Sequence, residues 1–224
     1  MPLESCRRSD DDWSSFSVPN RIPVFPLPNV VFFPKTYLPL HIFEPRYREM
    51  VADAAAEGRC VGIALLKEGW EQDYYGNPPV YDVGCVGRLI SAQGLPDGRF
   101  NILLQGLHRY EIREELYSKS YRQARIALKP LSLDSAVEAA GRAELVRLVG
   151  DYLRTQDNGY VWRGFLDSHV KDEVLINTLS TYLDLSPLEK QLLLEADSLR
   201  QRARRLGDLI QFKIYEREGM KGLG

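Results

Sequence analysis

The chain has 224 residues, of which 44% are hydrophobic and 27% are charged, a composition typical of one large globular domain or two small ones. Lys and Arg total 29 against 31 Asp and Glu, so the net charge of -2 gives no general attraction to nucleic acid or acidic membranes. No apolar run reaches membrane-spanning length, and Cys6, Cys60 and Cys85 form no C-x-x-C pair, which favours a cytoplasmic protein without disulfides, zinc or membrane contacts.

Residues 1–19 are polar and acidic, which predicts a flexible or loosely docked N-terminal arm. Over residues 22–50 a proline recurs every few residues among apolar side chains. Each proline fixes φ and removes a backbone donor, so this stretch predicts the short strands and turns of a small barrel or bent sheet. At Glu44-Pro45 a capping-type acid precedes a proline, and the apolar spacing that follows predicts one helix ending at Gly58.

Apolar runs between residues 60 and 128 predict the remaining strands. The clearest local signal is the segment GLPDG at 94–98, because proline presets a turn and Asp-Gly tolerates positive φ, which together predict a hairpin. The expected strands cover Cys60–Leu66, Val83–Ala92, Phe100–Gln105, His108–Arg113 and Ala124–Leu128.

Beyond Pro130 the apolar period changes from two residues to about 3.6, which predicts a helical subdomain. Ser186 to Glu189 form a capping box with proline at the first helical position, and Asn158-Gly159 supplies a stop for the first of the helices. Four helices are expected, one along the stripe Leu145–Leu153 and the others over Val170–Leu183, Pro187–Leu194 and Leu199–Ile214.

Several segments carry a family resemblance: PVFPL at 23–27, VVFFP at 30–34, LPL at 38–40, FEPRY at 43–47, YDVGCVGRLI at 81–90, LPDGRFNILLQG at 95–106 and the helical segment 185–194. Over roughly residues 20–218 the sequence resembles the Lon N-terminal domain, the substrate-binding domain of Lon proteases. The FEPRY segment is most similar to the free-standing bacterial members of that family, which lack the ATPase and peptidase domains.

The resemblance implies an α+β fold, with a PUA-like β-barrel subdomain and one helix over residues 20–130, a helical bundle over 131–218 and a tail over 219–224. The order of elements expected from periodicity agrees with it. The resemblance also implies a non-catalytic module, without cofactors, that binds unfolded or damaged protein segments or a protein partner.

The ATPase and Ser-Lys peptidase modules of Lon proteases are not expected, because the sequence reaches Gly224 before either could begin and contains no G-x-x-x-x-G-K-[ST]. His41, His108 and His169 lack the H-x-x-x-H or H-E-x-x-H spacing of metal sites, so no metal centre is predicted.

A first alternative is RNA binding, suggested by the PUA-like barrel and by a run of arginines. Acidic residues flank this run on the same expected helix, and the net charge is near neutral, so a solvated helix face is favoured over a nucleic-acid surface. The arginines of the run are Arg200, Arg202, Arg204 and Arg205.

A second alternative is an unrecognised hydrolase. His41 would be its base, with Cys60 or Ser91 as the nucleophile, but histidines and cysteines within strands are much more often packing residues. The charged group Glu44, Arg46 and Arg48 at the first helix start is given an architectural role, because an acid there complements the helix dipole and can pair with arginine.

The candidate polypeptide contact is the loop of residues 67–79, which carries Trp70, Tyr74 and Tyr75. Three aromatic residues on a polar loop bounded by Gly and Pro are typical of contact surfaces. The opposing interpretation is that Trp70 and one tyrosine fold back as a lid on the barrel. The sequence leaves both open.

Overall fold

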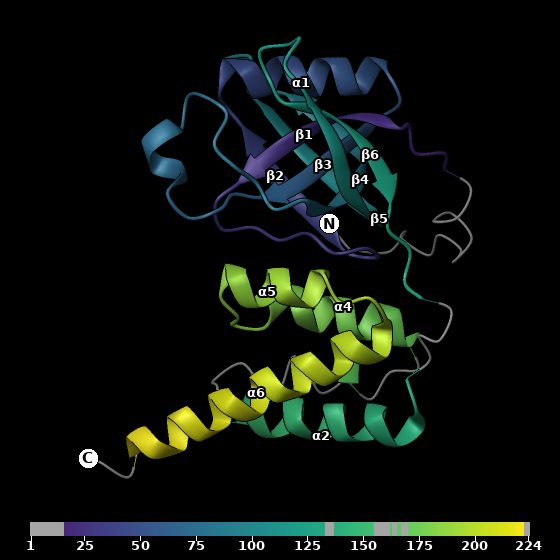
Figure 1. Cartoon of the computed structure of the whole chain (residues 1–224), viewed down its shortest axis with the longest axis vertical. Helices are drawn as coiled ribbons and strands as arrows, with labels where there is room; N and C mark the ends of the chain where they lie inside the picture. Colours follow the sequence, from purple (N-terminus) through teal and green to yellow (C-terminus); the bar gives the residue numbers. More distant parts are fainter. Residues whose placement is uncertain (1–15, 133–136, 155–161, 163–164, 167–169, 222–224) are drawn as a thin grey trace.

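The computed structural model describes residues 16–132, 137–154, 162, 165–166 and 170–221. Most of the expected N-terminal arm, the expected stop at Asn158-Gly159, and His169 lie outside these residues. The chain forms a β-barrel at one end and a group of helices at the other, with helix α1 (Pro45–Ala56) on the side of the barrel away from the other helices (Figure 1). The expected α+β fold, a PUA-like barrel followed by helices, is confirmed.

The strands form one sheet in the order β2-β5-β4-β3-β1-β6, and β6 also pairs with β5. Five strands therefore close into a barrel, and β2 is added beside β5. Strands β1 and β3 run parallel, and the other described pairs are antiparallel. The bounds are β1 Arg21–Leu27, β2 Tyr37–Ile42, β3 Cys60–Leu65, β4 Val83–Gly94, β5 Phe100–Leu116 and β6 Gln123–Leu128.

Strand β5 corrects one expectation. It runs unbroken for 17 residues, so two separate strands on either side of Gly106 were the wrong interpretation, although β4 and β5 do form the expected hairpin. Gly106 is required by a close approach rather than by a break, because a Cβ there would lie 2.3 Å from the carbonyl oxygen of Phe33. A register shift against β4 near this position bends the strand without ending it.

Helix α1 begins at Pro45, as expected, and buries one face against the barrel core through Tyr47, Met50 and Val51. It ends just before Gly58, whose φ of +68° suits a residue without a Cβ. The side chain of Glu44 makes no capping hydrogen bond, so its expected capping role is wrong. Its carboxylate instead contacts Arg46 and Tyr74.

Helices follow the barrel, as the change of period predicted, and the four with described bounds are α2 Ala139–Arg154, α4 Asp172–Tyr182, α5 Pro187–Leu194 and α6 Leu199–Lys221. Residues 162 and 165–166 are helical as well, which the prediction of four helices did not include. Helix α5 starts with the expected capping box, in which Ser186 accepts from the backbone N–H of Glu189 and Glu189 accepts from that of Ser186. None of the described helices combines the length and the apolar character that a membrane span requires.

One of the buried hydrophobic clusters contains residues of both the barrel and the helices. Val31 and Phe33, from the connection between β1 and β2, and Leu65 from β3 belong to the same buried cluster as Leu179 of α4 and Leu193 of α5. Because apolar side chains from both parts fill this cluster, the barrel and helices form one packed unit, and we call the contact region the joint.

Arg202 of α6 lies inside this joint with no exposed surface. Its Nε donates to the carbonyl oxygen of Leu193 at 2.9 Å, and its guanidinium lies 5.6 Å from the ring centre of Phe33. The expectation that the arginine run is a solvated helix face is therefore wrong at this position, although Arg200 and Arg204 are exposed.

Candidate functional site

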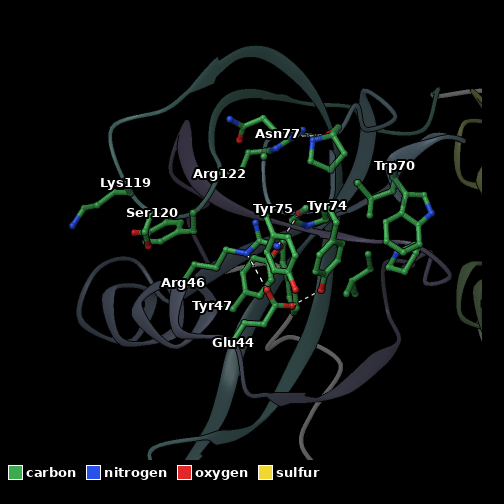
Figure 2. A pocket seen from close by; sticks show the side chains of 18 of the residues that line it. Glu44, Arg46, Tyr47, Trp70, Tyr74, Tyr75, Asn77, Lys119, Ser120 and Arg122 are labelled. Atoms are coloured by element: carbon green, nitrogen blue, oxygen red, sulfur yellow. Dashed lines mark hydrogen bonds and ion pairs between the residues drawn. The ribbon is translucent and has the colours of Figure 1, made fainter. Parts of the chain in front are cut away.

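A pocket of about 700 Å³ opens on the barrel (Figure 2). Its walls come from the ends of β1 and β2, the start of α1, and two connecting segments at 70–78 and 117–122. The first of these segments includes a short 3-10 helix, η2, at Trp70–Asp73. Because the walls come from several separate parts of the chain, no single local motif marks the site.

Apolar and aromatic side chains line the inner part of the pocket. The rings of Phe25 and Tyr47 pack with their centroids 4.3 Å apart, and Leu27, Leu40 and Leu66 lie beside them. Burial raises the pKa of Tyr47 to about 12, with Arg46 opposing the shift, so this phenol is neutral at physiological pH. Tyr47 therefore adds no charge to the inner part of the pocket.

A network of Glu44, Arg46 and Tyr74 ties the 67–79 loop to the start of α1. The Tyr74 hydroxyl donates to Glu44 Oε1 at 2.5 Å, Arg46 Nε lies 3.1 Å from Glu44 Oε2, and Arg46 Nη2 donates to the carbonyl oxygen of Tyr74 at 3.2 Å. The hydrogen bond to Glu44 raises the pKa of Tyr74. The Arg46 guanidinium also lies 4.6 Å from the centre of the Tyr47 ring. Glu44 therefore holds a loop in place rather than capping a helix.

The three aromatic residues predicted from the sequence all line the pocket, but they lie differently (Figure 2). Trp70 is half-buried and packs against a buried barrel cluster, and its ring centre is 5.6 Å from that of Tyr74. Tyr74 is held by Glu44, whereas Tyr75 is 88% exposed and meets the edge of Tyr74 at 5.0 Å. Trp70 and Tyr74 thus fold back onto the barrel, and Tyr75 is left available for contact.

Two further exposed aromatic residues of the pocket were missed by the sequence reasoning. Phe43, just after β2, is 60% exposed, and Tyr117, just after β5, is 61% exposed. Both follow the end of a strand, and an aromatic side chain at such an end was the signal that could have identified them. Together with Tyr75 they add exposed aromatic surface to the lining of the pocket, and we call these three residues the aromatic rim (Phe43, Tyr75 and Tyr117).

The arginine and lysine side chains of the pocket are each paired with a carboxylate. Arg122 is buried, its Nη1 lies 3.1 Å from Glu115 Oε1, and its Nη2 donates to a backbone carbonyl. Lys119 Nζ lies 3.1 Å from Asp53 Oδ2 at the outer edge, and Arg46 pairs with Glu44. Because these cations are neutralised locally, the pocket favours neutral, apolar groups over anionic ligands.

The structure does not assemble the residues of the hydrolase hypothesis. His41 is exposed on β2, where its Nδ1 lies 2.7 Å from Asn101 Oδ1, and strands β5 and β4 separate it from Cys60 on β3. Three strand spacings are roughly 14 Å, too far for proton transfer. Burial also raises the pKa of the Cys60 thiol to about 12. Ser91 lies on β4, one strand beyond β5.

Among the residues that the structure describes, no group of three or more His, Cys, Asp or Glu is placed to hold a metal ion. A closed barrel packed on helices, with an apolar pocket, an aromatic rim and paired cations, is the arrangement of an α+β binding domain. The chain belongs to the family of ATP-dependent protease La (LON) substrate-binding domains, which it matches over residues 21–211.

Relatives and solved structures agree with this assignment. The Lon protease of Flavobacterium johnsoniae is 26% identical over 199 residues, which are 87% of this chain and 24% of that protein. The Lon protease of Roseiflexus castenholzii is 27% identical over 205 residues, which are 90% of this chain and 25% of that protein. The chain thus spans about a quarter of the length of these curated relatives.

Two solved structures share the fold. The N-terminal domain of Mycobacterium avium complex Lon protease superposes with a TM-score of 0.65 at 16% identity, over 85% of this chain and 98% of that one. A Lon N-terminal domain protein from Xanthomonas campestris superposes with a TM-score of 0.60 at 22% identity, over 83% of this chain and 96% of that one.

Proposed function

We propose that the chain is a non-catalytic recognition module that binds unfolded polypeptide, with the pocket receiving large apolar side chains. The family is described as the substrate-binding domain of a protease, and the substrate of a protease is polypeptide. The observation that carries the proposal is the aromatic rim around an apolar pocket. Exposed aromatic side chains contribute much contact area at a low cost in conformational entropy.

The dimensions and charge of the pocket support this ligand. A volume of about 700 Å³ is in the range of sites that enclose a small molecule or several side chains. Large apolar side chains are buried in folded proteins and exposed in unfolded ones. A pocket that takes such groups, and whose cations are already paired, would select unfolded segments over folded surfaces.

Side-chain capture explains binding better than addition of a strand to the sheet edge. In the described sheet β2 pairs only with β5, so its other edge has no strand partner. Pro39 lies within β2 and lacks a backbone N–H, and a proline on an edge strand opposes pairing with a further strand. The pocket rather than the edge of β2 is therefore assigned the contact.

RNA binding has no comparable support. Of the four arginines that suggested it, Arg202 is buried, and Arg205 Nη1 donates to the carbonyl oxygen of Leu192 at 2.7 Å. Arg200 lies 3.6 Å from Glu138, which reduces the free positive charge further. A basic surface of this size would give weak, salt-sensitive binding at most.

The experiment compares affinity for a permanently unfolded, carboxymethylated protein by fluorescence anisotropy. Phe43→Ser combined with Tyr75→Ser should weaken binding about tenfold or more, because truncation of two contact aromatics costs at least about 1.4 kcal/mol. Tyr215→Ser is the matched control, since Tyr215 is 62% exposed on α6 and does not line this pocket. An equal loss in the control, or no loss in the double variant, would refute the assignment.

A further inference from the structure

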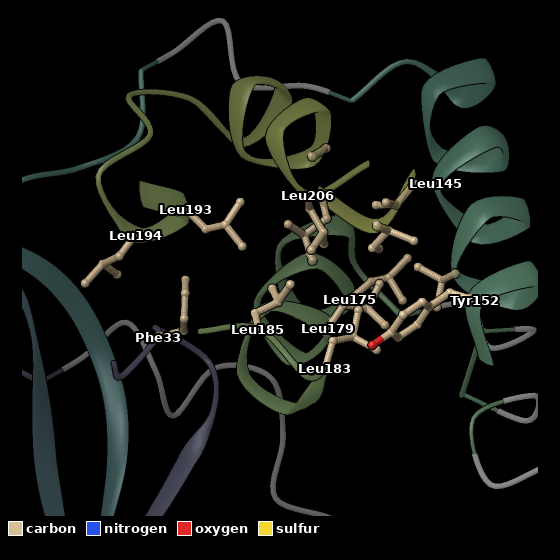
Figure 3. Packing of buried hydrophobic residues seen from close by; sticks show 14 of the residues in the cluster. Phe33, Leu145, Tyr152, Leu175, Leu179, Leu183, Leu185, Leu193, Leu194 and Leu206 are labelled. Atoms are coloured by element: carbon tan, nitrogen blue, oxygen red, sulfur yellow. The ribbon is translucent and has the colours of Figure 1, made fainter. Parts of the chain in front are cut away.

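Two arginines lie deep in the joint, close to the end of α5. Figure 3 shows the apolar residues Phe33, Leu193 and Leu194 of this part of the core. Arg109 of β5 is 3% exposed and Arg202 of α6 is 0% exposed. Arg109 Nη1 donates to the carbonyl oxygen of Leu194 at 2.8 Å, and Arg202 Nε donates to that of Leu193 at 2.9 Å. Arg109 therefore ties the end of α5 to the barrel, and Arg202 ties it to α6.

Within the described residues no Asp or Glu forms an ion pair with Arg109 or Arg202, and Glu173 is the acid whose charge reaches both. Asp197 acts on Arg109 from a distance but pairs with Lys129 at 3.4 Å. Two buried cations thus face Glu173 together with Asp197, whose charge is shared with Lys129, whereas buried charges in proteins are normally paired directly.

The neighbouring thiol does not supply the missing charge. Burial raises the pKa of Cys85, so it stays protonated although both arginines favour its ionisation. Burial also lowers the pKa of Arg202, and the charge of Arg109 lowers it further. The arginines therefore repel each other across a region that contains too little negative charge.

The guanidinium groups also have hydrogen-bonding capacity to spare. Arg109 makes hydrogen bonds to Leu194, Ala196 and Pro130, all through carbonyl oxygens. Arg202 bonds to Leu193, to Asn177 Oδ1 and, at 3.4 Å, to Leu194. A guanidinium has five N–H donors, so each group can donate further to a ligand.

A small cavity of about 50 Å³ lies at this place. Arg109, Arg202, Lys129 and His108 line it together with Glu173 and apolar residues. Since one water occupies about 30 Å³ of liquid, the cavity has room for a single small ion and not for a nucleotide or a peptide. Its lining carries three basic side chains against one acid, so the cavity favours an anion over a cation.

We propose that this cavity binds one small inorganic anion, of halide size, as the counter-ion of Arg109 and Arg202. The anion would accept hydrogen bonds from the N–H groups that do not donate to backbone carbonyl groups. Its negative charge would also offset the repulsion between the two arginines. A water molecule could accept the same donors but would supply no charge. Because Arg109 ties the end of α5 to the barrel and Arg202 ties it to α6, an anion bound to both would stabilise the joint.

The test uses the full chain and two readouts. Chloride replaces gluconate, an anion too large for the cavity, at constant ionic strength, and thermal unfolding is followed. The melting temperature should rise with chloride and saturate, as binding to the folded state requires. In crystals grown with bromide, anomalous scattering should place a bromide between Arg109 and Arg202.

Two lysine variants make the solution test specific. Lys129→Gln should raise the chloride concentration at half-saturation about threefold, the effect expected for one partly exposed charge. Lys213→Gln is the matched control, because Lys213 is also partly exposed and lies 3.5 Å from Glu189 away from the cavity. The proposal fails if chloride acts no differently from gluconate or if the cavity holds only water. Bromide in the cavity without a saturable chloride effect would be an adventitious ion only, and a chloride effect without bromide there would place the site elsewhere.

Discussion

Replacing Asn177 with alanine should loosen the joint between the barrel and the helices. Asn177 lies on α4 with no exposed surface. Its Nδ2 donates to the carbonyl oxygen of Pro34 at 2.9 Å, and its Oδ1 accepts from Arg202. One side chain thus connects the loop before β2, a helix and a buried cation.

The structure gives the size of the effect. Loss of the neutral bond costs about 1 kcal/mol, loss of the bond to a charged group about 1.5 to 3 kcal/mol, and both former partners are left buried. We expect the free energy of unfolding to fall by about 3 to 4 kcal/mol. For a chain of this size each kcal/mol corresponds to about 2 to 4 °C, so the melting temperature should fall by about 10 °C.

Urea unfolding followed by circular dichroism measures this loss, with Thr178→Ala on the same helix as the control. Thr178 is half-buried, and that variant should change stability by less than about 1 kcal/mol. If Asn177→Ala also costs less than about 1 kcal/mol, the polar contacts of the joint do not hold the two parts together, and the reasoning is refuted.

Three further results are expected. The pKa of Tyr47 in the folded state, about 12, lies above its ordinary value of 10.0, so the folded state holds this proton more tightly. The contribution of Tyr47 to stability should therefore be complete below pH 10 and be lost as the pH rises towards 12. In urea unfolding, Tyr47→Phe should lessen that loss. Cys60 and Cys85 should resist alkylation in the folded protein, as mapped by mass spectrometry, and rapid labelling of either would contradict their burial. Single-stranded RNA should show negligible binding near physiological salt in a gel shift, because Arg202 is unavailable; retained sub-micromolar binding there would revive the RNA hypothesis.

Local signals in the sequence predicted the local structure well. The capping box at Ser186–Glu189, the turn at 94–98 and the proline at the start of α1 each depend on a few adjacent residues, and all three are present. The prediction of a strand end at Gly106 was wrong because a glycine that ends a strand and a glycine that allows a neighbouring backbone to approach look alike in sequence. Only the position of Phe33, far away in the chain, distinguishes them.

The burial of Arg202 had a sequence signal that its charge concealed. It is three residues after Leu199 and four before Leu206, so it lies on the apolar stripe of α6. Its partners, Phe33 and the carbonyl groups at the end of α5, are supplied by the tertiary fold. The aromatic rim also depends on the tertiary fold. Tyr75 was predicted from the composition of its loop, whereas Phe43 and Tyr117 are brought to the same pocket only when the barrel closes.

The most direct test of the proposed function is to map the contact surface by NMR. Isotope-labelled protein is titrated with the carboxymethylated polypeptide, and shift changes are assigned along the chain. The proposed function predicts that they concentrate at Phe43, Tyr75 and Tyr117 around the pocket. Changes concentrated instead on the exposed side chains of α6, such as Phe212 and Tyr215, would contradict it.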